Sequence, residues 1–200
     1  DLYSSKSLEL LLNVPVPTIT GYSTQMQNVG KLQNKGVEFL LSTKNLVNTF
    51  KWSSDFNISF NKNKVLELGP GGQPIFASAP NASNAFITKI GQPVACFYGY
   101  VYDGVYMSEQ ELEDNPHLSK DKVGDGRYVD VNKDGVLDAN DKTILGNNQP
   151  IFTAGFNNTF SYKNLSLALQ FTASYGAEIF SIYKRMIAVY HGDRNGMIEV

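Results

Sequence analysis

The sequence predicts an all-β fold, an antiparallel slice of a large transmembrane β-barrel with long extracellular loops. Three observations lead to this fold class. Apolar and polar side chains alternate along two β-hairpins, the polar positions carry mostly small side chains, and short turns alternate with long connections. A period of two is typical of strands whose two faces have different surroundings.

The clearest alternation lies in residues 151–175. From 152 to 162 the apolar side chains occupy the even positions, and Asn158 is the only exception. After a turn at Lys163-Asn164 they occupy the odd positions from 165 to 175. The positions between them carry Ser, Thr, Asn, Gln, Ala and Gly, where a water-facing sheet usually presents Lys and Glu. This pattern is typical of outer-membrane barrel strands, which face lipid on one side and a wet lumen on the other.

A second hairpin, residues 31–62, has a similar character. One face of its returning strand is aromatic and apolar, with a gap at Ser54, and residues 45–48 are the predicted tight turn. The N-terminal stretch is a weaker strand because Leu11 breaks its alternation. Strands of about 10 residues, tilted by about 45°, are long enough to cross the hydrocarbon layer. In order, the predicted strands are residues 2–12, 31–44, 49–62, 151–162 and 165–176.

Long connections separate these strands, at residues 13–30, 63–150 and 177–200. Bacterial outer-membrane barrels have short periplasmic turns and long extracellular loops, so we place the long connections outside the cell. Residues 94–106 are aromatic and strand-like. If they formed one spanning strand, the two short turns would lie on opposite sides of the membrane. We therefore expect this segment to add β-structure within the outer loop.

Composition excludes several classes of protein. Seventeen basic and nineteen acidic residues give a formal net charge of −2, which gives no argument for nucleic-acid binding. A single cysteine, Cys96, excludes an internal disulfide bond, and no apolar run of about 18 residues or more could form a spanning helix. No nucleophile or acid–base arrangement stands out, so we predict no catalytic residue and no enzymatic activity. The chain begins with Asp1 rather than Met, and we interpret it as a piece of a longer protein.

Residues 130–141 match the twelve-residue calcium loop. Oxygen-bearing side chains stand at loop positions 1, 3, 5, 9 and 12, and glycine occupies position 6, where the chain must turn sharply. A solvated, Asx-rich turn is the alternative interpretation. The predicted oxygen donors of a structural calcium ion are Asp130, Asn132, Asp134, the carbonyl group of Val136, Asp138 (directly or through water) and Asp141, which is shorter than the usual glutamate.

Three tyrosines, Tyr98, Tyr100 and Tyr102, are the candidate ligand-binding residues. Aromatic rings in an outer vestibule stack on sugar rings, because both have flat apolar faces. The simpler interpretation is that these rings pack a β-hairpin. Both interpretations stay open at the level of the sequence.

Five further segments carry a recognisable pattern when they are taken together. They are residues 28–39 (NVGKLQNKGVEF), 50–64 (FKWSSDFNISFNKNK), 97–106 (FYGYVYDGVY), 128–135 (YVDVNKDG) and 145–156 (LGNNQPIFTAGF). In this order, and over nearly the whole chain, they resemble part of the C-terminal barrel region of the SusC/RagA family of TonB-linked outer-membrane transporters. The family's plug domain, its TonB box and most of its strands fall outside this chain.

The resemblance implies one slice of a plugged barrel of roughly 22 strands. It implies import of oligosaccharides, or of peptides, across the outer membrane of Bacteroidota, with outer-membrane lipid around the barrel. TonB would supply the energy through parts outside this chain. A SusD-like surface lipoprotein would cap the barrel and share the ligand.

A second hypothesis is a secreted, calcium-stabilised β-domain that binds carbohydrate. In such a domain the aromatic faces of the strands form a closed core. In a slice of a membrane barrel the same faces point to lipid. The surroundings of the aromatic side chains therefore separate the two hypotheses.

Overall fold

The computed structural model describes residues 1–15, 21, 24–80 and 82–182. Within it the chain forms two compact units. The first comprises Asp1–Ile75, Thr88–Val94 and Asn147–Ile179, and the second comprises Phe76–Ile87, Ala95–Gly146 and the chain from Phe180. Strands predominate, and helix α1 (Glu109–Asp114) has only six residues. No helix in this part of the chain is long and apolar enough to cross a membrane.

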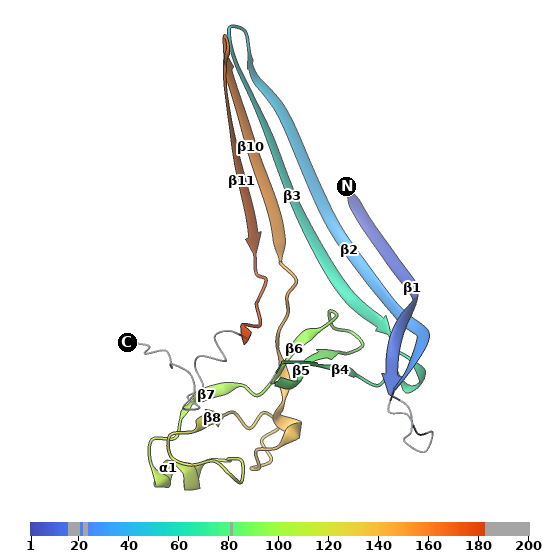
Figure 1. The fold of residues 1–200 in the computed structure, drawn as a ribbon, viewed down its shortest axis with the longest axis vertical. Helices are drawn as coiled ribbons and strands as arrows, with labels where there is room; N and C mark the ends of the chain where they lie inside the picture. Colours follow the sequence, from blue (N-terminus) through green and yellow to red (C-terminus); the bar gives the residue numbers. More distant parts are fainter. Residues whose placement is uncertain (16–20, 22–23, 81, 183–200) are drawn as a thin grey trace. The chain divides into compact units, whose positions relative to one another are not determined.

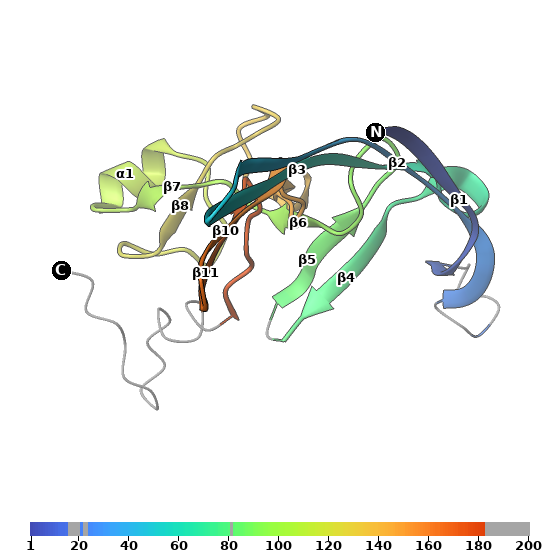
Figure 2. The same ribbon diagram turned by 90° about the horizontal axis from the view of Figure 1, so that it is seen from above.

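An antiparallel five-stranded sheet makes up most of the first unit. Its strand order is β1-β2-β3-β10-β11 (Figure 1). Viewed from above, the sheet is curved (Figure 2). The predicted antiparallel all-β fold is confirmed, and β10 pairs directly with β3 across the long connection. The strands are β1 Leu2–Pro15, β2 Thr24–Val47, β3 Phe50–Glu67, β10 Phe152–Tyr162 and β11 Leu165–Tyr175.

Strands β1, β2 and β3 are longer than predicted. β1 and β2 extend into the predicted loop 13–30, and β3 takes in residues 63–67. The predicted turn at 45–48 is reduced to Asn48 and Thr49. The difference arises because strand pairing is made by backbone N–H and C=O groups. Pairing therefore continues beyond the point where the side chains stop alternating.

The second unit contains the short strands of the long connection. One sheet has the order β4-β5-β6-β9, and β7 pairs with β8. The aromatic segment 94–106 is divided, because β6 pairs with β5 and β9 whereas β7 pairs with β8. From residue 183 on, the predicted loop 177–200 lies outside the described residues. The strands are β4 Ile75–Ala79, β5 Ala82–Thr88, β6 Cys96–Gly99, β7 Tyr102–Val105, β8 Gly126–Tyr128 and β9 Thr143–Gly146.

Buried apolar side chains are concentrated in the second unit. They include Ile87, Cys96, Tyr106, Leu112 and Leu137. The sheet of the first unit differs, because its residues 37–62 and 152–175 contain no buried apolar side chain. This part of the sheet is therefore not built around a core of its own.

Candidate functional site

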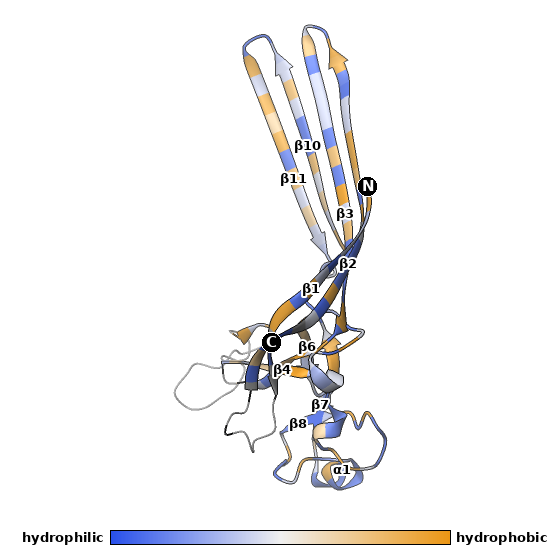
Figure 3. Ribbon diagram, turned by 90° about the vertical axis from the view of Figure 1, so that its right-hand side faces the viewer, coloured by the Kyte–Doolittle hydropathy of each residue, from blue (hydrophilic) through white to orange (hydrophobic). Residues whose placement is uncertain are grey.

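The register of the sheet aligns apolar side chains into rows. One row runs through four strands as Leu41–Phe56–Phe156–Phe171. Because every strand alternates, the rows share one face, and Figure 3 shows the hydrophobic positions recurring along β10 and β11. The other apolar rows are Phe39–Ile58–Ala154–Ala173, Leu46–Trp52–Phe160–Leu167, and Val37–Phe60 with Phe152–Tyr175.

Aromatic side chains lie at both ends of this apolar face and also in its middle, where the ring centroids of Phe56 and Phe156 are 6.5 Å apart. Near the two short turns, Trp52 and Phe160 stack with ring centroids 5.8 Å apart. At the opposite end, the Phe152 ring centroid lies 6.0 Å from that of Phe60 and 5.6 Å from that of Tyr175. Girdles of aromatic residues at both edges of an apolar band are typical of transmembrane barrels.

The apolar face is exposed. Phe171 is 59% exposed and Phe39 is 52% exposed. Leaving such surface in water costs about 25 cal/mol per Å², so the face requires an apolar medium that the described residues do not supply. From Phe50 to Phe60, β3 rises by roughly 33 Å at about 3.3 Å per residue. A tilt of about 40° reduces this rise to roughly 25 Å, the height of the apolar band of outer-membrane barrels.

A row of three polar residues, Thr43, Ser54 and Asn158, interrupts the apolar face, and two of them, Ser54 and Asn158, are buried. These two stand opposite each other in the register of β3 and β10. Ser54 Oγ donates to Asn158 Oδ1 (2.7 Å), and Trp52 Nε1 donates to the same oxygen (3.0 Å). Asn45 Nδ2 in turn donates to Ser54 Oγ (2.9 Å). These bonds lower the cost of holding polar groups on a face without water.

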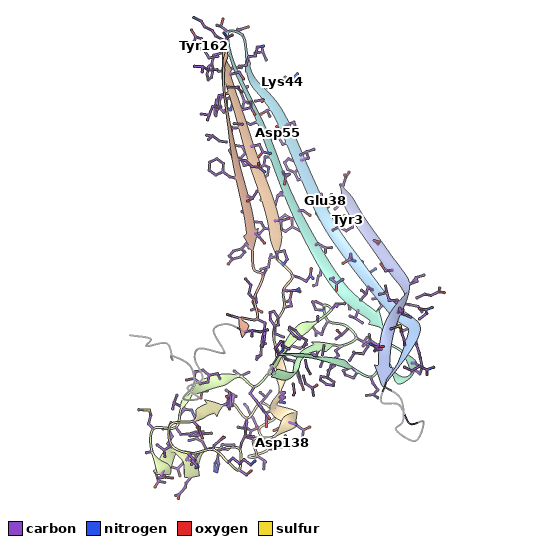
Figure 4. The ribbon with its side chains drawn as sticks, viewed as in Figure 1. Tyr3, Glu38, Lys44, Asp55, Asp138 and Tyr162 are labelled. Atoms are coloured by element: carbon purple, nitrogen blue, oxygen red, sulfur yellow. The ribbon has the colours of Figure 1, made fainter. Side chains whose placement is uncertain are left out.

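The opposite face of the sheet is mostly polar, with Leu40 and Val47 as apolar exceptions on β2. Glu38, Lys44 and Asp55, labelled in Figure 4, belong to this face on β2 and β3. Asn57 lies against Gly155, where a Cβ atom would come within 2.8 Å of Asn57 Nδ2. Glycine therefore permits a close contact between neighbouring strands. Two rows of this face are Glu38–Ser59–Thr153–Ser174 and Ser42–Asp55–Asn157–Gln170.

The candidate calcium loop, residues 130–141, turns around Asp130 in the second unit. Asp130 Oδ1 accepts a hydrogen bond from the backbone N–H of Lys133 (2.7 Å), and Oδ2 accepts one from Gly135 (2.8 Å). Lys133 and Gly135 have φ angles of 60° and 85°. This left-handed conformation closes the tight turn, and glycine adopts it without steric cost. The sharp turn expected at loop position 6 is therefore present.

The other predicted calcium donors bond to the loop's own backbone. Asn132 Oδ1 accepts from the N–H of Asp134 (2.9 Å), and Asp134 Oδ1 accepts from that of Val136 (2.9 Å). Asp138 Oδ1 caps a 3₁₀ turn by accepting from the N–H of Asn140 (2.7 Å). Across the described residues, no group of three or more His, Cys, Asp and Glu side chains is arranged to hold a metal ion.

Asp141 is the buried member of this loop. Its Oδ2 accepts a hydrogen bond from the backbone N–H of Asp138 (2.8 Å), and its Oδ1 accepts from Val131 (3.0 Å) and Asn132 (3.5 Å). The bond from Asp138, together with those from Asn132 and Val131, lowers the pKa of Asp141, while burial acts in the opposite direction. Asp141 is therefore a buried carboxylate whose hydrogen bonds tie both ends of the loop together.

The three predicted ligand-binding tyrosines do not form one surface. Tyr98 packs on a phenylalanine of β4 with ring centroids 5.5 Å apart. Tyr100 and Tyr102 both pack against Tyr128, at 5.4 Å and 6.3 Å, and Lys142 Nζ lies 5.2 Å from the Tyr100 ring centroid. Tyr128 and Lys142 were missed at the sequence level because they belong to segments distant along the chain. The structure thus supplies a smaller aromatic cluster with a cation above it.

No family model matches the chain. It is similar to TonB-dependent receptor P3 of Formosa agariphila, with 39% identity over 186 residues, which cover 90% of this chain and 19% of that protein. TonB-dependent receptor P26 of the same organism is 35% identical over 201 residues, covering 99% of this chain and 20% of that protein. TonB-dependent receptor SusC of Bacteroides thetaiotaomicron is 29% identical over 178 residues, covering 87% and 17%. The chain spans about a fifth of the length of these relatives.

Solved structures share the fold. The structure of the RagAB peptide transporter matches with a TM-score of 0.59 and 25% identity, over 86% of this chain and 18% of that chain. The RagAB peptide importer in its open-open state matches with a TM-score of 0.62 and 25% identity, over the same shares. The architecture described above therefore recurs as one segment of much longer chains.

Proposed function

We propose that the chain forms part of the barrel wall of a nutrient transporter. Over most of its length it is related to one segment of the TonB-dependent receptors of the SusC/RagA family, which are β-barrels of the Gram-negative outer membrane. The predicted family, fold class and location are confirmed. The activity of the whole protein is our proposal, because the chain spans about a fifth of its relatives.

The exposed apolar face of the sheet is the observation that carries this proposal. Its height of roughly 25 Å fits the hydrocarbon layer, and aromatic clusters lie at both of its edges. In the transporter this face meets lipid and the polar face lines the lumen. The alternative, a secreted carbohydrate-binding β-domain, needs a closed aromatic core. In the described residues the aromatic side chains of this face are exposed or half-buried, and none of them is buried.

The ligand and the partners of the whole receptor are part of the same proposal. It imports oligosaccharides or peptides, takes its energy from TonB and shares its ligand with a SusD-like surface lipoprotein. The similarity to SusC and to a RagAB peptide transporter supports this assignment. Similarity to receptors and transporters also supports the absence of enzymatic activity. Tyr100 and Tyr102, with Tyr128, are the proposed ligand contacts of the outer loop.

The test places arginine on either face of β11 in the intact receptor. Phe171→Arg puts a charge on the apolar face, where it costs about 2–4 kcal/mol near the middle of the bilayer. Gln170→Arg puts the same charge on the polar face, and Phe171→Leu controls for loss of the ring. We expect Phe171→Arg alone to lower the amount of folded, heat-modifiable receptor in outer-membrane fractions. A wild-type level of folded receptor for Phe171→Arg would contradict the proposal.

We also propose that residues 130–141 bind a structural calcium ion through the six predicted donors. The left-handed backbone at Lys133 and Gly135 supports this proposal, as does the buried carboxylate of Asp141, whose pKa is lowered by backbone hydrogen bonds. When bound, the ion supplies a positive charge that the carboxylates of the loop share. It would stabilise a stretch that has few buried apolar side chains, of which Leu137 is one.

Calorimetric titration of the intact receptor with calcium chloride tests this second proposal. Asp130→Ala combined with Asp134→Ala removes two donors, and we expect it to abolish the binding heat. Glu109→Ala combined with Glu113→Ala is the matched control, because it removes two exposed carboxylates from α1. Unchanged calcium binding by the variant that lacks both Asp130 and Asp134 would contradict a calcium site in this loop.

A further inference from the structure

The apolar face of the sheet changes abruptly to lysine at the end away from the short turns. In the row after Val37–Phe60, Lys35 stands opposite Lys62. One row further, Lys6 of β1 and Lys64 of β3 share a level through Gln33 of β2. All four lysines are exposed. Figure 3 shows the hydrophilic stretch of β2 that begins there.

The opposite face of the same strands carries no charge at this level. Tyr3 donates from its hydroxyl group to Asn61 Oδ1 (3.0 Å), and Asn63 Nδ2 donates to Asn34 Oδ1 (2.9 Å). The Asn34–Asn63 pair lies between the two lysine rows, and Asn61 directly precedes Lys62 along β3. The positive charge is therefore confined to the face that continues the lipid-facing surface.

The lysine rows carry an uncompensated electrostatic cost. In an antiparallel pair, side chains directly opposite each other have Cβ atoms about 5 Å apart, and like charges there are destabilising. The ion pairs formed by the described residues include Lys31 with Glu67 and none of the four lysines. An anion between Lys35 and Lys62 would convert this repulsion into attraction.

The depth of the Lys35–Lys62 row matches the head-group layer of a bilayer, and the Lys6–Lys64 row lies just beyond it. Two residues along a strand span about 6.6 Å, so the Lys35–Lys62 row lies roughly 5 Å in height beyond the last apolar row, with a tilt of about 40°. The Lys6–Lys64 row lies roughly 10 Å beyond the last apolar row. The head-group layer begins at the edge of the hydrocarbon core and is about 5–7 Å thick. Flexible lysine side chains reach across this difference.

An open hollow joins the two kinds of surface. Its lining includes Leu2, Val37 and Phe60 on the apolar side and Lys35 and Lys62 on the basic side. A molecule with an acyl chain and a phosphate group has the same two parts, because its acyl chain suits the apolar side and its phosphate group suits the basic side. We propose that Lys6, Lys35, Lys62 and Lys64 bind the phosphate groups of a lipid in the outer leaflet of the outer membrane. This inference rests on the proposed function, because it requires the apolar face to lie in a bilayer.

The test titrates the intact receptor, purified in dodecyl maltoside, with diphosphoryl lipid A and measures bound lipid by native mass spectrometry. Lys35→Gln combined with Lys62→Gln weakens lipid binding about five-fold per lysine, or roughly 25-fold. Lys44→Gln combined with Lys51→Gln is the matched control, because it removes the same charge from the polar face near the short turns. Arginine at both positions 35 and 62 restores binding. Inorganic phosphate alone binds far more weakly than the lipid.

The outcomes separate this inference from the proposed function. A folded wild-type receptor whose lipid binding is equal in both glutamine variants overturns the lipid site only. Binding of inorganic phosphate as tightly as lipid A also overturns the lipid site. So does an acidic protein that binds through these lysines while the glutamine variant binds lipid as the wild type does. A wild-type receptor that does not enter the micelle overturns the proposed function as well.

Discussion

Residues 37–62 and 152–175 of the sheet bury no large apolar side chain, whereas the second unit buries several. In the sheet of the first unit, Phe171 is 59% exposed, whereas in the second unit Tyr106 is fully buried and Leu137 is 3% exposed. The side chains are chemically alike, so the difference comes from the medium that each unit meets. The second unit removes apolar surface from water by its own packing, and the sheet leaves that surface for lipid.

The two units follow one rule for polar groups. In the second unit, the Tyr106 hydroxyl donates to the backbone oxygen of Pro116 (2.9 Å), and Arg127 pairs with Glu111. In the sheet, Ser54 and Asn158 satisfy each other. Any place without water requires paired polar groups, whether the surroundings are protein or hydrocarbon. The contrast between the units is therefore confined to their apolar side chains.

The largest effect that we expect is a loss of stability in the second unit, and its absence would contradict the comparison. Tyr106→Ala removes a fully buried ring and should destabilise the unit by about 3–5 kcal/mol, because a cavity remains. Limited proteolysis of the intact receptor should then cleave the second unit, while the barrel stays heat-modifiable. Tyr106→Phe loses only the hydrogen bond to Pro116, worth about 1 kcal/mol. Equal cleavage of wild type and Tyr106→Ala would show that the second unit has no core of its own.

A smaller effect is expected within the sheet. Asn158→Leu leaves the Trp52 indole N–H without its acceptor on the apolar face, at a cost of about 1–2 kcal/mol. Ser54→Ala combined with Asn158→Leu should cost less than the sum of the single changes, because the two side chains share one bond. Urea unfolding of the intact receptor in lipid vesicles measures all three variants. Additive losses would mean that the hydrogen bond does not form on the lipid-facing surface.

The sequence predicted β10 and β11 well because alternation depends on local spacing alone. It placed β10 and β11 within a residue of their observed bounds. It missed the extensions of β1, β2 and β3, since backbone pairing there continues under side chains that do not alternate. The pairing of β3 with β10 agrees with the expectation that residues 94–106 add no spanning strand between them.

Contacts that depend on the register between paired strands could not be predicted from the sequence. Ser54 and Asn158 stood out only as exceptions in two separate strands, and their hydrogen bond became visible when β3 and β10 were aligned. The lysine rows are similar, because Lys35 and Lys62 are distant in sequence and meet only through the pairing of β2 with β3. Tyr128 joined the tyrosine cluster through the pairing of β7 with β8.

The smallest effect that we expect is a difference in coupling energy between one ion pair in each unit. Arg127 and Glu111 are half-buried, with side-chain exposures of 27% and 26%, whereas Lys31 and Glu67 are 43% and 53% exposed. A double-mutant cycle on Lys31→Gln and Glu67→Gln should give a coupling below about 1 kcal/mol, because solvent and salt screen exposed charges. Arg127→Gln with Glu111→Gln should give a larger coupling that is less sensitive to salt. Hydrogen exchange of peptides from β3 and α1 measures the two cycles at low and high salt. Equal couplings would mean that both pairs meet the same medium, and the difference between the units would then be limited to the apolar face of the sheet.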